Sequence, residues 1–199
     1  MMDHRVLCGI AFLLLLSCYA SGQQIWQNRE VRLGDLPVRT AQSTDSMAVL
    51  VAELETIFHD PAVCCGKNSA LEDTVRSADP LALKEFSTKL QGRHRLSDGR
   101  LIMVTAEYLP QESINADWII TALVKKHALL MEWDSHLYVL YGAVFNEMVD
   151  ENGQRDLVIQ KLLLLDSRFS DARREASFDR ATDDFKKVQG LLMLSVPPQ

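Results

Sequence analysis

The chain is predicted to belong to the α+β class, with helices in its first half and an antiparallel sheet in its second half. Apolar residues between Met47 and Phe58 recur at spacings of three and four, which is typical of a helix with one buried face. After residue 100, long apolar runs rich in β-formers alternate with turn residues instead. The segment from Asp150 to Gly153 lies between two of these runs, and its Asn-Gly pair is a strong signal for a hairpin.

Three helices are expected in the first half, over residues 45–60, 65–76 and 79–92. Asp45 is a good N-cap for the first helix, and an Asp-Pro pair ends it. The third helix has clear punctuation, because Asp79 and Pro80 stand at its start and Gly92 stands just past its end. These helices should pack on the sheet that follows.

The second half should contain five strands and two further helices. Asn115 is a good N-cap for the first of these helices. The strands are expected over residues 101–108, 129–133, 137–145, 157–165 and 191–196, and the helices over residues 115–127 and 171–187.

Residues 1–22 are similar to a secretory signal peptide. Arg5 precedes an apolar run from Val6 to Leu16, which is too short to span a bilayer but suits the apolar region of a signal. Ala20 and Gly22 fit the small residues of a cleavage site, so cleavage after Gly22 is expected. The chain should therefore be exported, with a leader or linker over residues 23–43 and one domain over residues 44–199.

A second kind of processing stays open. The segment from Leu15 to Cys18 resembles a bacterial lipobox, in which Cys18 would be acylated and would become the mature N-terminus. With either processing, no other apolar run is long enough to cross a membrane. The mature protein would then carry no transmembrane segment and at most a lipid anchor at Cys18.

The charge of the chain argues against nucleic acid as a partner. The net charge is −6, and basic residues occur only in short pairs such as Lys125-Lys126. Binding to phosphates needs concentrated positive charge, so nucleic acid is not expected as a partner.

The predicted mature domain keeps two cysteines, Cys64 and Cys65, which are adjacent. They could form a vicinal disulfide, take part in a metal site, or include one reactive thiol. Adjacent cysteines are poor spacing for zinc, so neither a metal nor another cofactor is expected. The surrounding residues favour the reactive thiol.

Cys65 is the candidate nucleophile. It should lie where the loop after Pro61 turns into a helix, and a helix N-terminus lowers the pKa of a thiol. A thiolate also needs an imidazole partner and a group that orients the imidazole. His136 opens a long core strand and Asp166 ends the next strand, so these two residues are the candidate base and the candidate orienting group.

The hairpin register supports this pair without fixing it. A minimal turn at Asn152-Gly153 would place His136 opposite Phe169. A longer loop or a β-bulge is needed to bring His136 opposite Asp166, and bulges are common near active sites.

These motifs together resemble the papain-like cysteine peptidases, and most closely the compact bacterial branch that processes bacteriocin leaders. The resemblance is carried by Cys65-Gly66, by the segment His136-Leu-Tyr-Val-Leu-Tyr-Gly142 and by Asp166, in that order along the chain. It implies a papain-like fold and a Cys-His-Asp triad that acts on a peptide or protein substrate through a thioester, without a cofactor.

The chain departs from this family in the Asp-Ser pair after Leu165, where Asp-Pro is often found, and at one position that bears on catalysis. A glutamine usually stands six residues before the nucleophile and helps to form the oxyanion hole, whereas this chain has His59 there. A ring N–H can donate a hydrogen bond, so His59 is the candidate for the oxyanion hole, although it adds a titratable group.

Two hypotheses follow. The first is an exported cysteine hydrolase, a peptidase or amidase, that uses Cys65, His136 and Asp166. The second is a catalytically inactive papain-like relative, secreted or lipid-anchored, that binds a ligand without cleaving it. A histidine at position 59 keeps the second hypothesis open.

Overall fold

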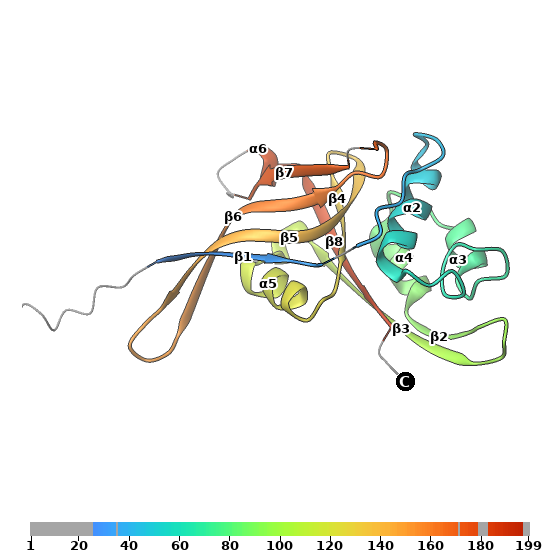
Figure 1. Cartoon of the computed structure of the whole chain (residues 1–199), viewed down its shortest axis with the longest axis horizontal. Helices are drawn as coiled ribbons and strands as arrows, with labels where there is room; N and C mark the ends of the chain where they lie inside the picture. Colours follow the sequence, from blue (N-terminus) through green and yellow to red (C-terminus); the bar gives the residue numbers. More distant parts are fainter. Residues whose placement is uncertain (1–25, 35, 171, 179–182, 197–199) are drawn as a thin grey trace, which may run out of the picture.

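The computed structural model describes residues 26–34, 36–170, 172–178 and 183–196, and shows an α+β fold (Figure 1). The predicted signal peptide and the lipobox lie outside the described residues. The helices are α2 (Ser46–Phe58), α3 (Glu72–Arg76), α4 (Leu83–Leu90), α5 (Ala116–Val124) and α6 (Asp183–Lys186), with a 3-10 turn η1 (Gln111–Ser113). Among these residues no helix is long and apolar enough to cross a membrane.

The strands form one antiparallel sheet of eight strands, in the order β2-β3-β8-β4-β5-β6-β7, with β1 paired to β5. They are β1 (Gln27–Arg32), β2 (Gly92–Arg95), β3 (Leu101–Pro110), β4 (Leu129–Trp133), β5 (His136–Val149), β6 (Arg155–Leu165), β7 (Arg173–Ser177) and β8 (Val188–Ser195). The long strand β5 pairs with β4 through its first residues and with β1 through its later ones.

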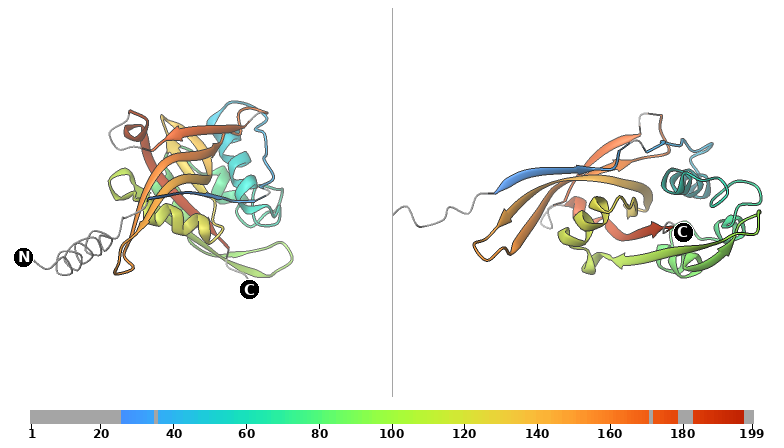
Figure 2. Two further views of the ribbon diagram at one scale, coloured as in Figure 1. Left: turned by 60° about the vertical axis from the view of Figure 1, so that its left-hand side comes forward. Right: turned by 60° about the horizontal axis from the view of Figure 1, so that its bottom comes forward.

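Helices pack against the sheet in two separate cores, and neighbouring residues of β4 enter different ones. Leu129 of β4 belongs to a core with Ile119 and Leu123 of α5. Its neighbour Leu130 belongs to a second core with Leu54 of α2 and with residues of α4. Helices α2, α3 and α4 lie together at the end of the molecule away from the β5–β6 hairpin (Figures 1 and 2).

Several sequence predictions are confirmed. Helix α2 begins after Asp45, whose side chain accepts hydrogen bonds from the backbone N–H groups of Met47 and Ala48. Asn115 caps α5 in the same way. Strands β5 and β6 form the predicted hairpin around Asp150 and Gly153. The α+β class therefore holds, whereas no observation confirms the papain-like arrangement.

Two predicted helices are wrong. The helix expected over residues 65–76 is only the short α3, because turns occupy the segment up to Leu71. The helix expected over residues 171–187 is replaced by β7 and the one-turn α6. The sequence of β7 suits a helix by propensity, but its pairing with β6 overrides that local preference.

Gly142 allows β1 to approach the centre of the sheet. A Cβ atom at this position would lie 2.7 Å from the backbone oxygen of Val31 and 3.0 Å from Cδ1 of Leu163. Neither neighbour can give way without moving β1 or repacking β6. A glycine in the middle of a long strand is thus explained by a close approach of another backbone.

We expect Gly142→Ala to lower the free energy of unfolding by about 1–3 kcal/mol, because the added methyl group overpacks this contact. Amide hydrogen exchange should become faster in β1 than in β8. Gly34→Ala is the matched control, since no atom lies within 4 Å of a Cβ built there. Equal destabilisation by both variants would contradict this account.

Candidate functional site

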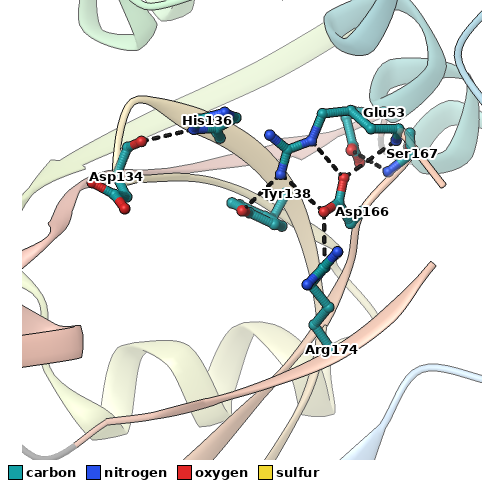
Figure 3. A network of polar contacts seen from close by, with 8 residues as sticks. Glu53, Asp134, His136, Tyr138, Asp166, Ser167 and Arg174 are labelled. Carbon is teal, nitrogen blue, oxygen red and sulfur yellow. Dashed lines mark hydrogen bonds and ion pairs between the residues drawn. The ribbon is translucent and has the colours of Figure 1, made fainter. Parts of the chain in front are cut away.

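His136 follows a tight turn between β4 and β5. Asp134 and Ser135 both have positive φ angles, as the two central residues of a type I′ hairpin turn require. The exposed imidazole of His136 lies back over this turn, with Nδ1 2.7 Å from the backbone oxygen of Asp134 (Figure 3). A carbonyl oxygen only accepts, so Nδ1 carries the hydrogen of this bond.

Asp166 is fully buried at the end of β6 and is held by two arginines. Nε and Nη2 of Arg168 donate to its two carboxylate oxygens at 2.8 and 2.9 Å, and Nε of Arg174 donates at 2.9 Å (Figure 3). Burial raises the pKa of Asp166, while the backbone N–H of Arg168 and the charge of Arg174 act in the opposite direction. Asp166 therefore serves as the shared anion of a polar cluster.

Arg168 also joins this cluster to β5. Its Nη2 donates to the hydroxyl of Tyr138 at 2.8 Å, and its guanidinium carbon lies 5.3 Å from the centre of the Tyr138 ring. The side chain is only 14 % exposed. Bidentate pairing and contact with an aromatic face are typical of a guanidinium that is fixed in one orientation.

Glu53 brings α2 into the same cluster. Its side chain is fully buried, and Oε1 accepts a hydrogen bond from the backbone N–H of Ser167 at 3.1 Å. Oε2 has no hydrogen-bond partner among the described residues. Burial is the main cause that raises the pKa of Glu53 to about 8, so the carboxyl group is protonated at neutral pH.

The strand register shows why His136 and Asp166 do not face each other directly. Near the turn Val149 pairs with Arg155, and at the far end Val139 pairs with Leu165. Between these points the pairing is irregular at two places. One irregularity skips a residue of β6 and the other skips a residue of β5, so the two shifts in register cancel. The register then continues to Tyr138 opposite Asp166, and the predicted pairing is displaced by two residues.

Cys64 and Cys65 are joined by a disulfide. They lie in the turns between α2 and α3, and α3 begins only at Glu72, so Cys65 is not at a helix N-terminus as expected. Cys64 is buried in the core and also lines a pocket of about 270 Å³ together with His59 and Asp60. Partial burial and the charge of Arg39 lower the pKa of His59.

The predicted site residues thus fall into two groups at opposite ends of α2. Ser46, the first residue of α2, lines a small pocket together with His136 and Arg168. His59 follows the last residue of α2 and shares the other pocket with Cys64. A helix of 13 residues is about 20 Å long, so this form of the chain holds Cys65 far from His136. The assignment of Cys65, His136 and Asp166 as a catalytic triad therefore stays a prediction.

Sequence reasoning missed Glu53, Arg168 and Arg174. One signal was readable, because Glu53 interrupts the apolar stretch from Leu50 to Leu54 of an amphipathic helix. A charged residue at such a position is rarely buried without a specific partner. The two arginines follow Asp166 closely in the sequence, but only the fold shows that both reach it.

No group of three or more potential metal ligands occurs in the described part of the chain. Comparisons with models of protein families, with curated proteins and with solved structures found no match to this chain.

We expect the stability of the protein to fall as pH rises, because of Glu53. A raised pKa in the folded state means that its contribution is complete below the ordinary value of 4.5 and is lost as pH rises through about 8. Glu53→Gln keeps the shape but removes the titration. The free energy of unfolding of the variant, relative to the wild type, should therefore increase by up to about 1.4 kcal/mol per pH unit across this window.

Urea unfolding at a series of pH values measures this difference. Glu55→Gln is the matched control, because Glu55 is on the same helix but partly exposed. If the difference between wild type and Glu53→Gln is constant from pH 5 to pH 9, folding does not raise the pKa of Glu53.

The disulfide predicts that Cys64 and Cys65 are oxidised in the isolated protein. In the protein isolated without reductant, the proteolytic peptide that contains Cys64 and Cys65 should be lighter by the mass of two hydrogen atoms than the dithiol form. It should take up an alkylating reagent only after reduction. Alkylation without reductant, measured by mass spectrometry, would contradict the disulfide.

Proposed function

We propose that this chain is an exported, catalytically inactive relative of the papain-like hydrolases, which binds a peptide or protein ligand without cleaving it. The site of binding is the pocket at the start of α2, between Ser46 and His136. The resemblance in the order of the motifs and the signal-like first 22 residues support the family and the export.

One observation carries the proposal. The two sulfur atoms that could act as nucleophiles are bonded to each other, at the end of α2 that lies away from His136. A disulfide has no thiolate, and a thiolate must lie within hydrogen-bond reach of its imidazole partner in order to be activated by it. The geometry therefore supports binding better than hydrolysis.

The potential nucleophile that lies in the same pocket as His136 is a serine hydroxyl. Ser46 lines the same pocket, but no hydrogen bond joins it to His136 in the described structure. A serine hydroxyl is a weak nucleophile unless an adjacent base activates it. Asp166 cannot orient His136 for this role in the observed arrangement, because the arginines occupy both of its oxygens.

A cysteine hydrolase is the second candidate, and one observation favours it. The imidazole of His59 and the sulfur-bearing residue Cys64 line the same pocket. The lowered pKa of His59 would keep its imidazole neutral near pH 7, as a general base requires. This candidate needs reduction of the disulfide before any chemistry can take place.

An activity assay separates the two candidates. The protein is incubated with fluorescein-labelled casein, before and after reduction, and labelled with a fluorophosphonate probe in parallel. We expect neither peptide release nor labelling of Ser46 in either state, because neither nucleophile is activated. Cys65→Ala is the matched variant and should behave like the wild type.

Casein cleavage that appears on reduction and is lost in Cys64→Ala or in Cys65→Ala would overturn the proposal in favour of the hydrolase, and the inactive variant would identify the nucleophile. His136→Ala then distinguishes the two possible bases. Loss of cleavage would require a rearrangement that brings His136 to Cys65, whereas cleavage that persists in His136→Ala and disappears in His59→Ala would assign the base to His59.

A further inference from the structure

The pocket at the start of α2 combines a cationic side, hydroxyl groups and an apolar wall. Its volume is about 80 Å³, and its polar lining is formed by Thr44, Ser46, Ser135, His136 and Arg168. Val49 and Leu137 line it from the core, and the half-exposed Leu81 lines it from the loop before α4. A space of this size holds one small functional group of a ligand rather than a whole ligand.

Arg168 has hydrogen-bonding capacity left over on this side. Its Nε and Nη2 donate to Asp166 and Tyr138, and these bonds fix the plane of the guanidinium. No bond from Nη1 is among the hydrogen bonds of the described residues, although Arg168 lines the pocket. A guanidinium fixed by two partners and open on one nitrogen is preorganised for an anionic oxygen.

Within the cluster of Glu53, Asp166, Arg168 and Arg174, positive charge exceeds negative charge. The single carboxylate of Asp166 is shared by Arg168 and Arg174, and Glu53 is neutral below about pH 8. Two carboxylates that adjoin pocket-lining residues in the sequence have partners of their own. Asp45 accepts hydrogen bonds from the backbone of α2, and Asp134 lies 3.9 Å from Nζ of Lys187 at the exposed turn.

We infer that this pocket binds a carboxylate group of the ligand, held by Arg168 and the neighbouring hydroxyls, beside an apolar wall that accepts an aliphatic chain. The inference rests on the proposed function, because it names the chemical group that the same pocket recognises. It is carried by Nη1 of the partly buried Arg168, which has no hydrogen-bond partner among the described residues, and by the sharing of one carboxylate between two arginines.

Titration of the full chain with propionate, followed by NMR chemical-shift changes of backbone amides, tests this inference. Propionamide is the matched neutral probe, because it has nearly the same shape and lacks the charge. We expect saturable shifts at Ser46, Ser135 and Arg168 with propionate only, at constant ionic strength. Equal shifts with both probes, or propionate shifts at other residues, would overturn the carboxylate site.

Leu81 offers a variant that leaves the cluster intact, whereas replacement of Arg168 removes support from Asp166 and risks the fold. Leu81→Glu places a competing carboxylate at the pocket and should weaken propionate binding at least about tenfold. Leu81→Gln, of matched shape, should change the affinity by less than about threefold. Equal affinities in both variants would show that the anion binds elsewhere.

The outcome can be separated from that of the proposed function. Failure of propionate to bind, without any cleavage of casein, removes the carboxylate site and leaves a binding protein for a different group. Cleavage of casein by the reduced protein removes the proposed function whatever propionate does.

Discussion

The buried contact between α2 and the end of β6 is the constraint on which the rest of the structure depends. Glu53 comes from the middle of a core helix and accepts a hydrogen bond from the backbone of Ser167, immediately after Asp166. Two buried carboxyl groups so close together cannot both be charged without a large cost, and the arginines neutralise only Asp166. The proton on Glu53 is what allows the helix to pack here.

This contact also determines what faces solvent at the start of α2. Asp166 fixes Arg168, and Arg168 in turn contacts Tyr138 of β5, so that the ends of three elements distant in sequence are held in one arrangement. The turn that carries His136 precedes Tyr138 by a few residues and is positioned by the same strand. A polar pocket at this place is therefore a consequence of how the buried charge of Asp166 is neutralised.

The sequence predicts the parts of this arrangement that depend on local patterns. The cap at Asp45, the period of α2 and the Asn-Gly hairpin each leave a signal in consecutive residues. The site depends instead on the strand register and on contacts between residues that are distant in the sequence. The length of the loop between Val149 and Arg155 sets the β5–β6 register, and this register, continued past the Val139–Leu165 pair, brings Tyr138 rather than His136 to the level of Asp166. Equally, Cys65-Gly66 suits a helix start, but the vicinal disulfide and the turns around it delay α3.

Helix α2 thus separates two groups of candidate site residues, which the order of the motifs in the sequence had assigned to one site. Its start meets Arg168 and His136, while its end meets His59 and the bonded cysteines, about 20 Å away. The cysteines form a disulfide, and Cys64 shares a pocket with His59, whereas the other end offers the hydrogen-bond donors of Arg168 and no cysteine among its lining residues. Since a rigid helix cannot bring its two ends together, any function that used both would need a ligand long enough to span it. A peptide of six or more extended residues, at about 3.3 Å each, has that length.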